Sequence, residues 1–259
     1  MKSQKNLKKR EIQDAQVQNL ISVFAKMQEV HNSASSLALK ALQGLKDLSH
    51  VVKQLQSVIV RLPDSKDYRK ALLKAADLGW YFPIHTWDAE EIFKVESLID
   101  NQKFQSVNQI LIPFYKDRLK DLENELLKRF PKRGKVLSAA FQAHNGKAYE
   151  LSIPIFISQA EGIFYDQTGE FYFRKKNKKQ TWINALNDPY LIDILSNLVD
   201  ETALTIHSSK MSNYPSGINR HLILHGLDSK YPSRLNSFKA ISFLYAISIN
   251  LSDILTWKN

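Results

Sequence analysis

Apolar residues recur every three or four positions along much of the chain, which is the spacing of one face of an α-helix. In the first half the pattern covers residues 11–60, 65–79, 89 onward and 108–130. Asp64 or Ser65 stands at the start of the second stretch, and Thr86 or Asp88 precedes the third. Short polar side chains of this kind cap helix N-termini. The first half is therefore predicted to be a series of helices.

The segment Phe130-Pro131-Lys132-Arg133-Gly134 interrupts the helical pattern, because Pro and Gly both break helices. Beyond it, further helices are predicted at residues 136–144, 149–165, 189–206, 218–226 and 233–255. Alternating strand patterns are weak throughout. We therefore predict an all-α fold, with a helical N-terminal region of unassigned role at residues 1–130 and a helical domain at residues 131–259.

Composition narrows the class of protein. The 44% hydrophobic content supports a packed core, and 259 residues suffice for one large domain or two ordinary ones. The absence of Cys excludes disulfides and thiolate metal sites. The basic first ten residues lack the apolar run of a secretory signal, and the longest uncharged stretch, residues 240–252, is too short to span a bilayer. We expect a cytoplasmic protein that does not enter membranes.

The chain is basic, with 36 Lys and Arg against 26 Asp and Glu and a formal charge of +10. Such a surface favours polyanions such as RNA, although ordinary proteins also reach this charge. The densest basic run is made of Arg174, Lys175, Lys176, Lys178 and Lys179. Four aromatic residues lie close by, between positions 171 and 182. The run is predicted either to bind an RNA backbone whose bases stack on the aromatic rings, or to form a solvated loop.

The string Asn219-Arg220-His221-Leu222-Ile223-Leu224-His225-Gly226 carries the candidate chemistry. It resembles the signature of the HEPN (higher eukaryotes and prokaryotes nucleotide-binding) superfamily, in which Arg is followed by a polar residue and later by His. Arg220, His221 and His225 match that signature. The helices predicted on either side are also similar to those of bacterial HEPN-type proteins with toxin and phage-defence roles. The resemblance covers roughly residues 131–256.

The resemblance implies an RNA-cleaving site that works without a metal. Such cleavage activates a 2′-hydroxyl against the adjacent phosphate, and a His near neutrality can take or give the proton. A guanidinium can hold the phosphate and stabilise its growing charge. We therefore expect Arg220 and His225 to perform the chemistry while His221 positions it, and we expect Asn219, directly before the motif, to support them.

Arg220 and His225 lie five positions apart, about 140° around a regular helix, and so do not share a face. They can converge if Arg220 lies at the capped start of its helix, or if a second subunit completes the site. In the family the motifs of two subunits face each other, which implies a homodimer. Some members also carry, two residues after the motif His, a Tyr to which a partner antitoxin transfers AMP. Leu227 stands there in this chain, so the resemblance does not extend to that regulation.

Other polar residues near the motif have two interpretations. Glu161 lies in an otherwise apolar helix, either as a carboxylate that orients Arg220 or His225, or as a surface residue. His221 and His225 have the spacing of zinc-binding helices, but the Glu of an H-E-x-x-H pattern and a nearby third ligand are both missing. We therefore predict no metal and no other cofactor.

Two functions are consistent with these residues. The first is a dimeric, metal-independent endoribonuclease, acting as a toxin or phage-defence effector and restrained by a protein inhibitor or sensor. The second is a non-catalytic HEPN dimerisation or nucleotide-binding scaffold whose N-terminal helices bind a partner.

Overall fold

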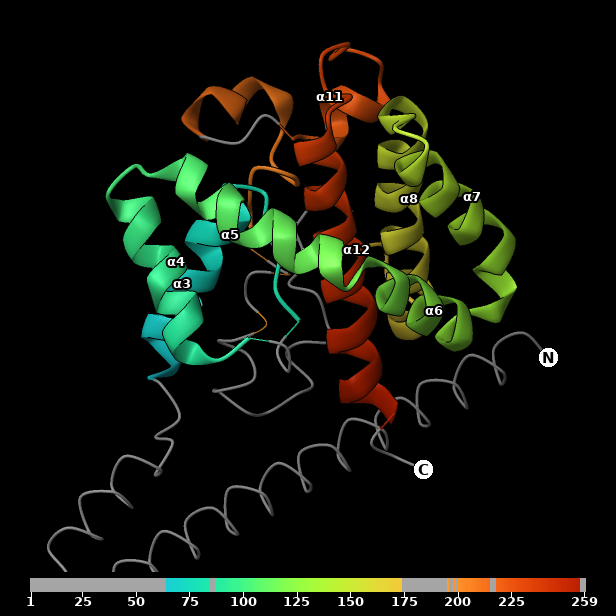
Figure 1. Ribbon diagram of the computed structural model, residues 1–259, viewed down its shortest axis with the longest axis horizontal. Coiled ribbons are helices and arrows are strands. Elements are labelled where there is room, and N and C mark those ends of the chain that lie inside the picture. The colour runs from blue at the N-terminus through green and yellow to red at the C-terminus, as the bar shows by residue number, and fades with distance from the viewer. Residues whose placement is uncertain are drawn as a thin grey trace, which may run out of the picture.

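The computed structural model describes residues 64–83, 87–173, 195, 198, 200–214 and 218–256, with side chains described as far as Asn250. Every regular element in these residues is a helix, so the predicted all-α class is confirmed for them (Figure 1). The helix predicted at residues 11–60 and the basic run at residues 174–179 lie outside the described residues.

The described residues form ten helical elements, two of them short 3₁₀ helices labelled η. They are α3 (Ser65–Asp77), α4 (Ala89–Asp100), α5 (Phe104–Asp117), α6 (Leu119–Arg129), η1 (Pro131–Arg133), α7 (Gly134–Asn145), α8 (Tyr149–Thr168), η3 (Ser208–Asn213), α11 (Arg220–Leu224) and α12 (Arg234–Thr256). None of the helices in the described part of the chain is long and apolar enough to cross a membrane.

The first two helices begin where polar side chains satisfy free backbone amides. The Asp64 side chain accepts hydrogen bonds from the amides of Lys66 and Asp67 at the start of α3. At α4, Asp88 and Glu91 form a capping box, in which each carboxylate accepts from the other residue's amide. Both helix starts were predicted, each aspartate being one of two candidate caps, because a cap is a local interaction between neighbours in sequence.

Three helix predictions need correction. The stretch 108–130 is not one helix, since α5 ends and α6 begins at Arg118. Residues 200–206, predicted as the end of a helix, form turns instead. The helix predicted at residues 218–226 is only five residues long, because Asn219 caps its start and Gly226 ends it with a left-handed backbone, φ +68°.

Helix α12 runs through the centre of the molecule, and α8 packs along it with α7 on the outer side of α8 (Figure 1). Residues 80–83, between α3 and α4, also lie against α12. The ring of Tyr81 meets Phe243 edge-on with centroids 4.9 Å apart, and the Tyr81 amide donates to Ser242 Oγ at 3.2 Å. Asn250 donates to the carbonyl of Phe82 at 3.2 Å. One core therefore continues across the predicted boundary at residue 130.

The core also accounts for the aromatic segment that follows α3. Trp80, Tyr81, Phe82 and Trp87 are all buried. Trp80 stacks on Tyr115 of α5, with ring centroids 5.8 Å apart. Each fully buried side chain of this size contributes about 1.5–3 kcal/mol relative to an exposed one. These rings thus join α3, α5 and α12 into one unit.

Candidate functional site

Asn219 fixes the start of the short helix that carries the motif. Its side chain is fully buried. The Oδ1 atom accepts from the Leu222 amide at 3.1 Å, which is the N-cap bond, while Nδ2 donates to the carbonyls of Ala203 and Ile206 at 2.8 and 3.0 Å. One amide group therefore ties α11 to the turn at residues 203–206. The next residue, Arg220, is the first residue of α11.

The end of α11 is fixed by its backbone. Gly226 adopts a φ of +68°, which a residue with a side chain reaches only with strain. The following amides, of Leu227 and Asp228, donate back to the Leu222 carbonyl at 2.8 and 3.1 Å. The chain consequently turns back against α11 directly after His225, which leaves that imidazole exposed at the end of the helix.

A side chain anchors the same turn to α8. Pro154 lies within α8 and has no amide N–H, so the Glu150 carbonyl lacks its usual helical donor four residues on. The Tyr231 hydroxyl donates to that carbonyl at 2.8 Å. Pro154 is the sixth residue of α8. Its position in the second turn gives the motif's trailing loop a fixed attachment.

Three imidazole rings contact one another around α11. The rings of His221 and His225 meet edge-on with centroids 4.4 Å apart, and the ring of His207 lies 5.0 Å from that of His221. We did not predict the part played by His207. Three of the seven histidines in the chain fall within residues 207–225, and this clustering was the signal available in the sequence.

The three rings differ in their surroundings. His207 precedes η3, and its Nδ1 accepts from the Ser209 amide at 3.3 Å, so the neutral ring carries its proton on Nε2. His221 is half-buried. Its burial lowers its pKa from the usual 6.5, and the neighbouring His225, His207 and Arg220 lower it further. His221 is therefore neutral at pH 7 and can accept a proton.

Arg220, the first residue of α11, contacts the ring of Phe173. Its guanidinium carbon sits 4.3 Å from the centre of the Phe173 ring, a cation–π contact. Its Nε is buried and has no hydrogen-bond acceptor among the described residues. Burial lowers the pKa of Arg220, while the Glu161 carboxylate opposes that shift. Stacking on Phe173 and attraction to the Glu161 carboxylate thus hold the Arg220 side chain, and its Nε remains a donor without a described acceptor.

Of the two residues that Glu161 was predicted to orient, the structure shows an electrostatic interaction with Arg220. Its Oε1 accepts from the Phe173 amide at 3.4 Å, which places Phe173 beneath the guanidinium. The carboxylate is half-buried. Arg220 thus faces Phe173 while His225 faces His221. The capped start alone does not bring the two predicted catalytic groups together.

The imidazole cluster does not form a metal centre. Within the described residues, no three His, Asp or Glu side chains are placed to hold a metal ion. The His221 ring meets those of His207 and His225 at interplanar angles of 41° and 74°. The arrangement suits proton transfer between a bound ligand and imidazole groups.

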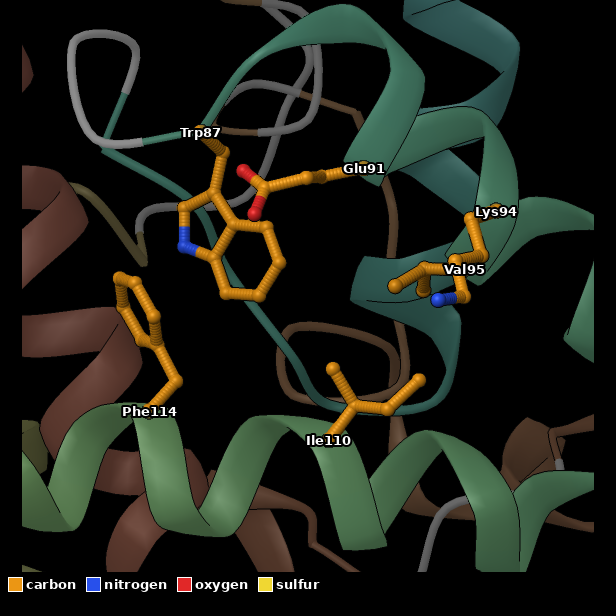
Figure 2. A pocket seen from close by; sticks show the side chains of 6 residues that line it. All are labelled: Trp87, Glu91, Lys94, Val95, Ile110 and Phe114. Atoms are coloured by element: carbon orange, nitrogen blue, oxygen red, sulfur yellow. The ribbon is translucent and has the colours of Figure 1, made fainter.

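A pocket of about 280 Å³ lies between α4 and α5, far along the chain from this cluster. Figure 2 shows its lining, with Trp87 and Glu91 above and Ile110 and Phe114 of α5 below. Glu91 already accepts from the Asp88 amide in the capping box. The described residues that line the pocket include no His, Ser or Thr, and the carboxylate of Glu91 serves the helix start. Its chemistry is that of a packing recess.

Comparisons with protein-family models, curated proteins and solved structures find no match for this chain. The fold and the site alone therefore describe the class of protein. It is an all-α protein with three imidazoles in contact around α11, next to an arginine that stacks on Phe173.

Proposed function

We propose that this protein is a metal-independent endoribonuclease of the HEPN type, with its active centre at the imidazole cluster of α11 and η3. The observation that supports the proposal is the ring contact of His221 with both His207 and His225 at the protein surface. Metal-free RNA cleavage needs one group that takes a proton and another that gives one, and adjacent imidazoles can fill both roles.

In the proposed reaction the 2′-oxygen of a ribose forms a bond to the adjacent phosphorus, and the bond from phosphorus to the 5′-oxygen breaks. Neutral His221 or its neighbour His225 takes the proton of the 2′-hydroxyl. A second, protonated imidazole gives a proton to the departing 5′-oxygen. The products are a 2′,3′-cyclic phosphate and a 5′-hydroxyl, and no metal or oxidant takes part.

Arg220 is proposed to bind the reacting phosphate. Leaving its buried Nε without an acceptor costs about 1–3 kcal/mol. That cost favours rotation of the guanidinium away from Phe173 toward an anionic oxygen, where it can donate two parallel hydrogen bonds. The guanidinium of Arg220 is then stacked on Phe173 in the free protein and hydrogen-bonded to the phosphate when RNA is bound.

A second subunit is proposed to complete the centre, because Arg220 and His225 face different neighbours within one chain. Leu224 and Leu227 flank His225 and are 43% and 67% exposed. Apolar side chains beside a polar cluster are typical of a protein-binding surface. The same leucines favour a second candidate function, a non-catalytic dimerisation scaffold.

The deciding experiment incubates purified protein with RNA in excess chelator. The parent protein should cut, and His225→Ala should cut about 10²- to 10⁴-fold more slowly, the usual share of general acid–base catalysis. Ser229→Ala is the matched control, since Ser229 is exposed in the same loop and lies outside the imidazole cluster. If His225→Ala and the parent cut RNA equally, or if neither cuts RNA, the endoribonuclease proposal is wrong and the scaffold function is favoured.

A further inference from the structure

The segment around the imidazole cluster carries a net positive charge. Residues 207–234 contain four Lys and Arg, three His and a single acidic residue, Asp228, for a net charge of +3 with neutral His (4 − 1). The remaining 231 residues together carry +7 (10 − 3). The charge per residue is thus about three times higher here than elsewhere.

Two lysines lie close in the chain to the imidazoles, Lys210 three residues after His207 and Lys230 five residues after His225. Lys210 belongs to η3, and its amide donates to the His207 carbonyl at 2.9 Å. Lys230 lies in the loop that folds back onto Leu222, and its amide donates to Asp228 Oδ1 at 2.7 Å. Both side chains are exposed. The backbone of each lysine is therefore fixed close to the cluster.

Neither lysine has an acidic partner in the part of the chain that the structure describes. Among the described residues, no carboxylate lies within 4.0 Å of the ammonium group of Lys210 or Lys230. Some other cations in the described residues are paired, such as Arg69 with Asp200 at 2.8 Å and Lys74 with Glu96 at 2.7 Å. The charge near the imidazoles remains available for a ligand.

We propose that Lys210 and Lys230 bind backbone phosphates of a single-stranded RNA on the two sides of the imidazole cluster. This inference rests on the proposed function, because it assigns the substrate contacts that flank the same centre. Lysine offers a mobile point charge that follows a phosphate without reading the base. The two contacts would hold the strand across the histidines without selecting its sequence.

Binding can be measured separately from cleavage with the full chain carrying His225→Ala. The affinity of a labelled single-stranded RNA is followed as salt increases. For single strands, each phosphate contact contributes about 0.7 to the slope of log affinity against log salt. Replacing Lys210 and Lys230 together with Ser should reduce that slope by about 1.4. A DNA strand of the same sequence should show the same reduction, because lysine contacts the phosphate and not the 2′-hydroxyl.

The matched control replaces Lys128 and Lys132 with Ser. These lysines, on α6 and η1, are also exposed and also lack an ion pair among the described residues. The control should leave the slope unchanged. If both double variants reduce the slope equally, or if neither does, the assignment of phosphate contacts is wrong. The proposed function is judged separately, by whether the parent protein cuts RNA in chelator, so the two failures can be told apart.

Discussion

The Tyr231 hydroxyl donates a hydrogen bond to the Glu150 carbonyl, 2.8 Å away, at a backbone position that Pro154 deprives of its helical donor. A proline in one helix and a tyrosine about eighty residues later thus form one attachment. It joins the loop after the motif helix α11 to the second turn of α8. The exposed end of α11, where His225 lies, depends on this loop for its position.

Tyr231→Phe should lower the free energy of unfolding by about 0.5–1 kcal/mol, because it removes one partly exposed hydrogen bond and little apolar contact. Urea unfolding measures the change. Tyr165→Phe is the control, since the Tyr165 hydroxyl makes no hydrogen bond to a described residue. Equal stability changes in the two variants would show that the Glu150 carbonyl is served by another donor.

Asn219→Ala should have a larger effect, lowering the free energy of unfolding by about 2–4 kcal/mol. The change removes the N-cap of α11 and leaves two buried carbonyls, of Ala203 and Ile206, without this donor. Asn213→Ala, at an exposed asparagine of η3, should change stability by less than about 0.5 kcal/mol. If both variants unfold at the same urea concentration, the buried amide does not hold the turn at residues 203–206.

The parts of the fold that the sequence predicted are those fixed by local interactions. Asp64 and Asp88, each one of two candidate caps in the sequence, form the caps of α3 and α4, because a cap joins residues two or three positions apart. The break at Arg118 was missed. Neither Gly nor Pro stands there, and the residue takes an ordinary backbone conformation, φ −99° and ψ 0°.

The parts of the candidate site that were missed depend on contacts between distant residues. Fourteen positions separate His207 from His221, and only the fold brings their rings to 5.0 Å. Phe173 was grouped with the basic run on its sequence position, yet it packs under Arg220. Helical periodicity predicts neither contact, because in each case the two residues do not lie in the same helix.

A third prediction concerns Gly162 of α8. The Arg133 guanidinium lies on this glycine, and it donates to Asp166 at 2.8 Å and to Gln159 at 3.0 Å. A methyl group at position 162 would overlap Nη1 of Arg133. Gly162→Ala should therefore displace the guanidinium, and the lost hydrogen bonds should offset the gain of about 1 kcal/mol in helix propensity.

A double-mutant cycle of Gly162→Ala and Arg133→Ala tests this packing directly. In an Arg133→Ala background the overlap is gone, so Gly162→Ala should stabilise the protein by about 1 kcal/mol. In the parent the same change should give less than half of that gain, or destabilise. Urea unfolding of the four proteins yields the coupling directly. An identical effect of Gly162→Ala in both backgrounds would contradict the close packing of Arg133 on α8.

The last prediction concerns pH, through a histidine buried where α7, α8 and α12 meet. His144 Nδ1 is hydrogen-bonded to Ser237 Oγ at 2.7 Å, and Ser237 lies 3.1 Å from Ser152 Oγ. The ring also packs edge-on against Phe238, with centroids 4.8 Å apart. Burial lowers the pKa of His144 from 6.5 to about 4, and the positive charge of Arg234 acts in the same direction.

The sign follows from proton binding in the two states. Between pH 6.5 and 4 the unfolded chain binds a proton at His144 and the folded protein does not. The stability due to neutral His144 is therefore fully present above pH 6.5 and is lost as pH falls toward 4, by at most about 3 kcal/mol. Asp77 acts in the opposite direction. Burial raises its pKa from 3.8 to about 6, so its contribution is present at low pH and is lost as pH rises through 6.

The two effects offset each other in the parent protein, and single variants separate them. His144→Gln should be less stable than the parent at pH 7, and the difference in unfolding free energy should shrink as pH falls to 4.5. Asp77→Asn should show the reverse trend, with its deficit relative to the parent growing over the same range. Urea unfolding at pH 7, 6, 5 and 4.5 measures both. A constant difference between His144→Gln and the parent would mean that His144 titrates equally in the folded and unfolded states, and that its burial between α7 and α12 does not keep it neutral.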